Sequence, residues 1–539
     1  MYKEKGIVWI ILVLLVCLQL PQAISARPSV PADQPVPVTT ITVDSGLDID
    51  NTADKICTGE DACTLRRAIV EANGLSVEER PVLIAFDIPA TAEEGYDSTL
   101  DAWELEIKAA GNDEPVFPIL EGGQIMIDGT TQPGGRAEAP KIILVGPATG
   151  NKDALVLGVD ASGDHDLNGV TGLAFQNFQN HVFVNSNENM IDHNWFGLTS
   201  DGNAPYLRNG DAQDGSGRDG ITLGEGVNNN TIIENVFLGF DGTAVILNGD
   251  HNTFRHNNVG TDADGEVPGK ETDPALVCSS ADWLGGGGLI VDGDYQYVNE
   301  NVFAGLRQHL TLASMQPDAI HVSSSTMLHE ISGNYIGLTL TEKPVGVCGR
   351  GINMDEPYMV RVEFNRFANT GYSAIALSGA GYDGNPLRTN TILQETPWPE
   401  DVGDQAEDAI QLGASLPQSL LNFEPAVVTS VEGTVATGTS APGSLCPHCV
   451  VELFLDDNDT IVEALESLAV VTTDDEGNWQ VDLSHALGVN QGLRTTSTSR
   501  DYDTIPGLNG GTNTGLSVLY AVEPAPEYEY AFLPLVIGK

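Results

Sequence analysis

Six segments in the middle of the chain decide the fold: IDHNWF (191–196), IIENVF (232–237), FRHNNV (254–259), VNENVF (298–303), ISGNYI (331–336) and VEFNRF (362–367). In each segment an apolar residue is followed by Asn three positions later and by a second apolar residue two positions after that. The Asn residues are Asn194, Asn235, Asn257, Asn301, Asn334 and Asn365. A motif that recurs with fixed internal offsets, at intervals of roughly 20 to 50 residues, predicts a solenoid.

A second short element alternates with these segments: a residue that is small in all but one copy, followed by apolar, any and apolar residues. Its copies begin at Ala154, His181, Gly220, Ala244, Gly288, Ala319, Gly351 and Ala374. Alternation with period two is typical of strands. We therefore expect about eight coils with at least two short strands each, and such strands bury their apolar faces only when coils stack. The sequence predicts an all-β parallel β-helix.

The Asn residues should lie one above another at a bend of each coil. A carboxamide has donors and an acceptor, so stacked Asn side chains can satisfy one another where an unpaired polar group would cost about 1–3 kcal/mol. In the first turn Leu173 replaces Asn, between Val170 and Phe175, as an end of the ladder would allow.

A leucine-rich repeat is the alternative solenoid, because its consensus also contains Leu-x-x-Asn-x-Leu. The second elements are 23 to 44 residues apart here, and the intervening segments are rich in Gly, Asp and Asn without helical periodicity. Both features favour the β-helix.

The N-terminus predicts export. Residues 1–26 combine Lys3 and Lys5 with an apolar run over 7–20 and a small-residue cleavage site, as a Sec-type signal peptide does. The apolar run is too short for a membrane span. Residues 27–40 are Pro-rich and predict a linker. We expect a secreted or cell-surface protein without a transmembrane span in the mature chain.

Composition limits the partners. The 24 basic and 76 acidic residues give a formal net charge of -52, so the field of the molecule repels nucleic acid and most polyanions. Many Gly residues and few aromatics suit a turn-rich extracellular β protein. The sequence gives no signal for the oligomeric state.

The cysteines left after cleavage suggest disulfides. In an exported chain an even count favours pairing, and the expected pairs are Cys57 with Cys63, Cys278 with Cys348, and Cys446 with Cys449. Zinc at the CPHC segment is the alternative for the last pair, but only His448 accompanies it.

Residues 41–150 should form an N-terminal cap and the first strands, and residues 151–395 the β-helix. The segment CTLRRAIVEAN (63–73) contains the one convincing helix near the start, Leu65 to Asn73, which would cover the open end of the solenoid. This segment resembles the CSLREA motif of exported bacterial β-helix proteins, although Thr64 and Arg67 replace its usual Ser and Glu. Residues 86–88, IDGTTQPG (127–134) and NVGTDADG (258–265) are also similar to that family. The resemblance implies a right-handed, pectin-lyase-like parallel β-helix at the cell surface.

A second unit should follow the solenoid. After an acidic linker at 396–422, the segments VVELFLD (450–456), LAVVTTDDEGNWQVDL (468–483) and LRTTSTS (493–499) alternate like strands. They predict a β-sandwich at 423–522. It is similar to the immunoglobulin-like modules that often follow such solenoids. The tail at 523–539 is similar to Leu-Pro-Leu endings of some bacterial surface proteins.

Long insertions between copies 194 and 235, 257 and 301, and 334 and 365 should line up as a wall beside a groove. Aromatic rings over a shallow groove suit stacking on sugars, and the candidate ligand-binding residues are Trp195, Glu234, Tyr335 and Glu363. Val302 is expected to be exposed on the outer face, so that its truncation would cost far less than that of the inward Phe303.

Catalysis in this groove is the alternative to binding. A lyase needs a cation and a base, whereas a hydrolase needs two carboxylates about 5 to 9.5 Å apart. The candidate catalytic residues are Asp192, Arg255, His256 and Glu300. The paired-Asp, Gly-His-Gly and Arg-x-Lys motifs of polygalacturonases are absent.

The one cofactor that the sequence suggests is Ca²⁺. One set of candidate ligands is Asp164, Asp166 and Asn168, which match the start of an EF-hand loop, although Phe175 stands at position twelve, where that loop requires Glu. The other set is Asp262 and Asp264 in an acidic turn. The turn at 456–459 is a further acidic candidate. Taken together, we expect an exported recognition or structural protein that contacts an extracellular glycan or cell-envelope component, with a polysaccharide lyase or glycoside hydrolase as the alternative.

Overall fold

The computed structural model describes residues 36–48, 57, 62–108, 115–147, 152–207, 218–269, 287–307, 317–324, 326–379, 384–395, 408–500 and 512–521. The predicted signal peptide, the first part of the predicted linker and the predicted tail lie outside these residues. Within the described part of the chain, no helix is both long enough and apolar enough to cross a bilayer.

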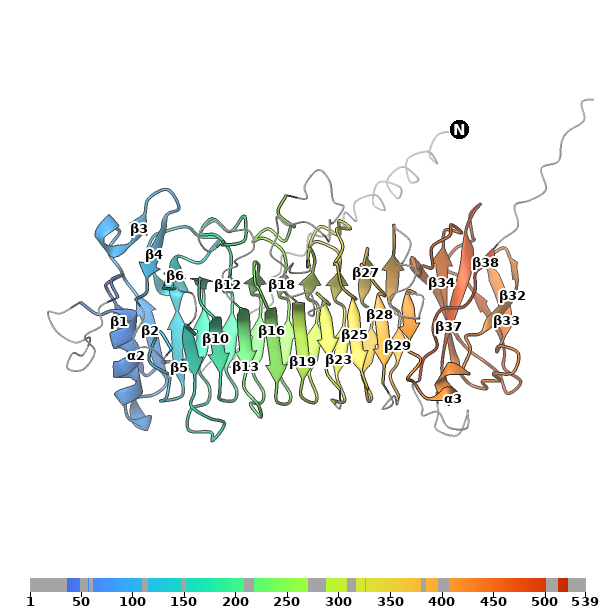
Figure 1. Ribbon diagram of the computed structural model, residues 1–539, viewed down its shortest axis with the longest axis horizontal. Coiled ribbons are helices and arrows are strands. Elements are labelled where there is room, and N and C mark those ends of the chain that lie inside the picture. The colour runs from blue at the N-terminus through green and yellow to red at the C-terminus, as the bar shows by residue number, and fades with distance from the viewer. Residues whose placement is uncertain are drawn as a thin grey trace, which may run out of the picture. The chain divides into compact units, whose positions relative to one another are not determined.

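Three sheets of successive strands make up the solenoid (Figure 1). Sheet A contains β1 (Thr39–Val43), β2 (Val82–Phe86), β5 (Ile125–Asp128), β8 (Gly169–Thr171), β11 (Met190–Asp192), β14 (Thr231–Ile233), β17 (Thr253–Arg255), β20 (Tyr297–Asn299), β23 (Glu330–Ser332), β26 (Arg361–Glu363) and β29 (Leu387–Arg388). Sheet B contains β3 (Tyr96–Asp97), β4 (Ala102–Glu106), β6 (Ile142–Val145), β9 (Leu173–Gln176), β12 (Trp195–Phe196), β15 (Val236–Phe237), β18 (Asn258–Val259), β21 (Val302–Phe303), β24 (Tyr335–Ile336), β27 (Arg366–Ala368) and β30 (Thr391–Leu393).

Sheet C contains β7 (Leu155–Leu157), β10 (Asn180–Val184), β13 (Asp219–Leu223), β16 (Thr243–Asn248), β19 (Gly287–Asp292), β22 (Ile320–Val322), β25 (Ile352–Asp355), β28 (Ile375–Ser378) and β31 (Ile410–Leu412). Every strand pair in the three sheets is parallel except β3 with β4. Short 3-10 helices lie at Val77–Glu79, Ala92–Glu94 and Gly129–Thr131. From β7 onward each coil adds one strand to each sheet, so the predicted parallel β-helix is confirmed.

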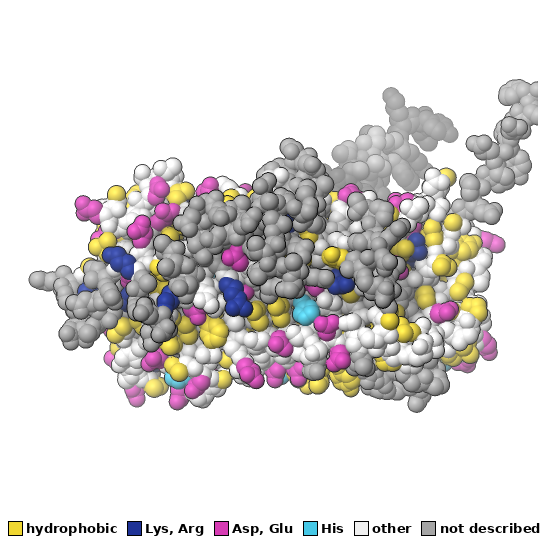
Figure 2. Space-filling model, viewed as in Figure 1, with side chains coloured by type: hydrophobic (Ala, Val, Ile, Leu, Met, Phe, Trp, Pro, Cys, Tyr) yellow, Lys and Arg dark blue, Asp and Glu magenta, His cyan; other side chains and the backbone are white. Residues whose placement is uncertain are grey.

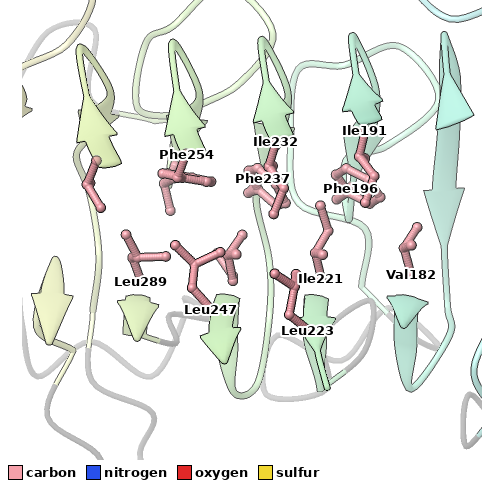
Figure 3. Close-up of a cluster of buried hydrophobic side chains, with 14 of the residues drawn as sticks. Val182, Ile191, Phe196, Ile221, Leu223, Ile232, Phe237, Leu247, Phe254 and Leu289 are labelled. Carbon is pink, nitrogen blue, oxygen red and sulfur yellow. The ribbon is translucent and has the colours of Figure 1, made fainter. Parts of the chain in front are cut away.

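The repeat places like residues over like in the core. Ile191 is in register with Ile232, and Ile232 with Phe254. The rings of Phe196 and Phe237 stack at 4.9 Å between centroids, and Figure 3 shows these columns pointing toward the inward residues of sheet C. All of the inward residues of the six segments are buried. The apolar columns thus form one continuous core.

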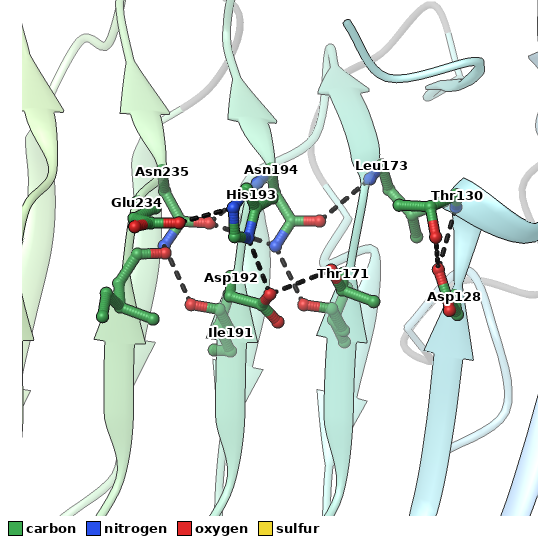
Figure 4. A network of polar contacts seen from close by, with 12 residues as sticks. Asp128, Thr130, Thr171, Leu173, Ile191, Asp192, His193, Asn194, Glu234 and Asn235 are labelled. Atoms are coloured by element: carbon green, nitrogen blue, oxygen red, sulfur yellow. Dashed lines mark hydrogen bonds and ion pairs between the residues drawn. The ribbon is translucent and has the colours of Figure 1, made fainter. Parts of the chain in front are cut away.

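The predicted Asn ladder runs along the bend between sheets A and B (Figure 4). The backbone N–H of each Asn donates to Oδ1 of the Asn in the next coil at 2.9–3.0 Å, from Asn194 to Asn365. Nδ2 donates to that same Oδ1 at 2.9–3.2 Å. Leu173 starts the ladder by donating its N–H to Asn194, and Asn390 ends it.

A second ladder, which the sequence analysis missed, runs along the bend between sheets C and A. It consists of Asn168, Asn189, Asn230, Asn252, Gln296 and His329, joined by N–H to side-chain acceptor bonds of 2.9–3.2 Å. His329 closes it: Nδ1 accepts the N–H of Gln296, and Nε2 lies 2.9 Å from the hydroxyl of Thr326. Burial lowers the pKa of His329 to about 4, which keeps Nδ1 free to accept.

Both ladders follow a residue in the left-handed conformation. Along the bend between sheets A and B, φ lies between 53° and 67° at His193, Glu234, His256, Glu300, Gly333, Phe364 and Thr389. This backbone turn is what brings each following amide into the coil, while the side chain of the left-handed residue points outward. We call this row the ridge.

The predicted cap helix is α2 (Leu65–Gly74), whose apolar side chains are buried against the first coils. Thr64 caps it by accepting the N–H of Arg67 at 3.4 Å. Arg66 makes two bonds of 2.7–2.8 Å to the carboxylate of Asp48, and both side chains are buried. Asn73 donates to the carbonyl of Ile119 and accepts from the following turn.

The C-terminal unit is a two-sheet antiparallel sandwich. One sheet contains β32 (Val427–Glu432), β33 (Val435–Thr439) and β36 (Asn478–Asp482), and the other β34 (Val450–Asp456), β35 (Glu466–Thr472), β37 (Gly492–Thr498) and β38 (Tyr520–Ala521). They enclose a separate apolar core around Trp479. The predicted linker at 396–422 is partly structured, since it contributes β31 to sheet C and the short helix α3 (Gln418–Leu421).

The disulfides Cys57–Cys63 and Cys446–Cys449 are present as predicted. The latter leaves no cysteine of CPHC for zinc. Cys348 is also disulfide-bonded, whereas Cys278 lies outside the described residues.

Candidate functional site

The outer face of sheet B is covered. The loops after β12, β18 and β24, which the sequence analysis expected to form a wall, fold over this sheet and bond to one another through Ala263 N–H to Gly202 O and Leu340 N–H to Gly265 O. Beneath them Trp195 is 9% exposed and packs with Leu198, Val236 and Leu238. The prediction of an exposed sugar-stacking ring at Trp195 is therefore wrong.

The same covering applies further along sheet B. Val302 is 2% exposed and packs with Val267, Ala304 and Val345, with Tyr335 beside them. The guanidinium of Arg366 lies 5.4 Å from the centre of the Tyr335 ring. The prediction that Val302 is exposed is wrong, because alternation points it out of the coil but the insertion buries it. Tyr335 is half-buried in this cluster and is not a free platform.

The outer face of sheet A is open from β14 onward, whereas Met190 and Asp192 of β11 are buried. Three columns of side chains point outward there: the first residue of each strand, the third residue, and the ridge. The column formed by the third residue of each strand contains, in successive coils, Asp192, Ile233, Arg255, Asn299, Ser332 and Glu363. It includes three of the residues that the sequence suggests for the groove, Asp192, Arg255 and Glu363.

A shallow depression of about 530 Å³ lies on this face over four coils. It is lined by Thr253, Arg255, Tyr297, Asn299, Glu300, Ser332, Gly333 and Phe364. The Tyr297 side chain is 43% exposed and that of Phe364 60% exposed. Two open aromatic rings thus accompany a floor of hydroxyl, amide and charged groups.

The polar groups of the depression are organised by bonds between coils. Arg255 donates through Nε at 2.9 Å and Nη2 at 2.7 Å to one carboxylate oxygen of Glu300. Asn299 donates to the Ser332 hydroxyl at 2.7 Å and to Glu330 at 3.2 Å. These contacts connect the floor residues of neighbouring coils to one another.

Three of the four candidate catalytic residues meet here. His256 Nε2 lies 3.1 Å from the carboxylate oxygen of Glu300 that Arg255 also contacts. Asp192 lies apart, on β11, two strands from Arg255. It belongs to a separate group in which His193 has Nδ1 2.8 Å from Asp192 and Nε2 2.5 Å from Glu234 (Figure 4). The structure does not bring the four residues together.

Of the other predicted ligand-binding residues, Glu234 lies on the ridge in that imidazole contact. Glu363 is mostly buried and accepts from Arg361 at 2.7 Å, and this hydrogen bond raises the pKa of Arg361.

The predicted Ca²⁺ ligands do not converge. Asn168 is a buried member of the second ladder, and Asp166 accepts the N–H of Asn187. Asp262 accepts the N–H groups of Asp264 and Glu266, as in an ordinary acidic turn, and burial raises its pKa. Asp164 joins no acidic cluster in the described part of the chain.

Among the described residues, one group of three acidic side chains lies close enough to hold an ion, namely Asp457, Asp459 and Glu463. It includes part of the turn at 456–459. Burial raises the pKa of Glu463 to about 7, with the neighbouring Asp carboxylates adding to the effect.

Sequence reasoning missed both aromatic residues of the depression. Tyr297 stands four positions before Asn301, and Phe364 one position before Asn365. Both offsets are constant in the repeat, so the outward positions four and one residues before each ladder Asn identify them. Asn390 was missed as well, although Leu387 and Ile392 flank it at the offsets of the other copies.

No protein-family model matches the chain, and no curated protein sequence matches it. Among solved structures, ORF18 of Geobacillus virus E2 aligns with a TM-score of 0.34 and 10% identity, over 90% of this chain and 79% of that one. The enzymatically active domain of tailspike protein 2 from bacteriophage CBA120 aligns with a TM-score of 0.25 and 9% identity, over 86% and 76%.

The full-length tailspike protein 2 from Escherichia coli O157:H7 bacteriophage CAB120 gives a TM-score of 0.28 and 9% identity, over 84% of this chain and 66% of that one. At these values the similarities carry no conclusion about what this chain binds.

Proposed function

We propose that this protein is an exported β-helix of the CSLREA type that binds extracellular glycans on the open face of sheet A. The observation that carries the proposal is the pair of open rings, Tyr297 and Phe364, on either side of a polar floor. Sugars present apolar C–H faces and hydroxyl edges, and sites that combine a few fixed polar groups with aromatic surface suit them.

Export and family membership rest on the sequence. The signal peptide features and the disulfides support an extracellular location. Two residues shared with the CSLREA-like segment connect the cap to the first coils: Arg66 through buried hydrogen bonds and Asn73 through a part-buried one. These contacts give the motif a structural reason and support the family assignment. An immunoglobulin-like assignment of the sandwich is part of the same proposal.

Catalysis is the second candidate function, and the meeting of Arg255, His256 and Glu300 in the depression favours it. Two facts count against it: the arginine already shares its charge with Glu300, and Asp192 is remote. Incubation with polysaccharides, followed by reducing-sugar release and ultraviolet absorbance of unsaturated products, tests this function. Turnover that Glu300→Gln abolishes would replace binding by catalysis.

Glycan binding is tested on an array with the secreted, full-length protein and with Tyr297→Ala. Binding that Tyr297→Ala weakens at least tenfold supports the proposal. A purely structural spacer, in contrast, would bind no glycan on the array.

A further inference from the structure

One position of the ridge lacks a side chain. The ridge carries His193, Glu234, His256 and Glu300 in successive coils, then Gly333, then Phe364. Gly333 therefore leaves a notch between the side chains of Glu300 and Phe364, at the edge of the depression.

Neither backbone nor packing requires glycine there. Its φ of 67° lies close to the values of 53° to 58° that the other ridge positions adopt with His, Glu, Phe or Thr, so the fold accepts side chains in this conformation despite their cost of roughly 1–2 kcal/mol. A Cβ atom at Gly333 would lie 3.4 Å from Cγ of Glu300, an ordinary contact. Glycine avoids that conformational cost at this position and leaves open space at the edge of the depression.

The arginines around the notch are paired with carboxylates, and carboxylates are in slight excess. Of the residues that line the depression, only Arg255 and Glu300 carry a formal charge, and they neutralise each other. Beyond it, Arg361 is paired with Glu363 and Glu330. The formal charge of the chain is -52, and Figure 2 shows acidic side chains outnumbering basic ones on the face that it presents.

This pairing of charges selects among glycans. A uronate or sulfated sugar needs a cation that is not already neutralised, and it would meet the repulsive field of an acidic protein. Drawing Arg255 toward such a ligand would leave Glu300 unpaired beside it. A neutral pyranose, by contrast, needs hydrogen-bonding groups and an apolar surface, which Asn299, Ser332 and the two rings supply.

We propose that the Gly333 notch seats one pyranose residue of an uncharged polysaccharide, held between the Tyr297 and Phe364 rings over the Asn299 and Ser332 floor. This inference rests on the proposed glycan-binding function and names its ligand class and its seat.

The test is calorimetric titration of the full-length secreted protein with two sets of oligosaccharides. The neutral set is cellohexaose, xylohexaose, mannohexaose and laminarihexaose, and the anionic set is hexagalacturonate and hexamannuronate. Gly333→Asn fills the notch, and Asn tolerates the left-handed conformation. Tyr295→Ala is the matched control, because Tyr295 is 38% exposed but stacks on His251 at 4.6 Å on the other bend.

We expect a neutral oligosaccharide to bind. Gly333→Asn and Tyr297→Ala should weaken that binding at least tenfold while both variants keep a cooperative thermal melt, and Tyr295→Ala should leave the binding intact. Binding of the anionic set alone, or neutral binding that Gly333→Asn does not change, would overturn this inference and leave the glycan-binding function standing. Failure of both sets to bind would remove the proposed function together with the inference.

Discussion

The outer faces of sheets A and B come from the same repeat and differ in what covers them. On sheet A, the strands present Tyr297 and Asn299 to solvent, whereas on sheet B, a few residues later, Val302 is buried under an insertion. The insertions follow strands of sheet B and fold back onto it. Alternation therefore decides only whether a side chain points into the coil, and the position of the insertions decides which outward face remains open for a ligand.

The largest effect should come from the core that both sheets share. Phe303→Ala removes a fully buried ring from the stack and should lower the free energy of unfolding by about 3–5 kcal/mol. Urea denaturation of the variant measures it. A loss below about 1 kcal/mol would mean that the aromatic column is not the core.

Acid should weaken the ladder on one side of sheet A and not the ladder on the other side. The ladder between sheets A and B consists of amides, whereas the ladder between sheets C and A contains His329. Because the folded pKa of His329 is lowered to about 4, its contribution to stability is present above its ordinary value near 6.5 and is lost as the pH falls from there to about 4. The loss is at most about 3 kcal/mol, at roughly 1.4 kcal/mol per pH unit.

His329→Gln, which copies Gln296 of the preceding coil, should remove this acid sensitivity. Denaturation at pH 7 and pH 4.5 checks it, with Asn334→Gln in the other ladder as the control. Equal acid sensitivity of the wild type and His329→Gln would place the titrating group elsewhere.

The smallest stability effects compare the two outer faces within one coil. Val302→Ala should cost about 2 kcal/mol, because it opens a cavity beneath the insertion. Asn299→Ala, on the open face, should stay within about 0.5 kcal/mol. Equal losses in the two variants would show that the two faces are equally covered or equally open.

The sequence predicts the coil but not its cover. Stacking forces residues at equal offsets into one column, so Ile191, Phe196 and Asn194 identify the core and the first ladder. The sequence does not reveal the second ladder, because its column contains Asn, Gln and His. These residues differ in type and share only the ability to accept a hydrogen bond. Trp195 was misplaced because an insertion has no period, and its path depends on apolar contacts that form only in the fold.

Oxidative footprinting of the intact protein by hydroxyl radicals tests the contrast between the faces most directly. The account predicts rapid modification of Tyr297 and Phe364 on sheet A and protection of Trp195 and Val302 on sheet B. Each modification rate is divided by the intrinsic reactivity of its side chain. A normalised rate for Trp195 equal to that for Tyr297 would contradict the account.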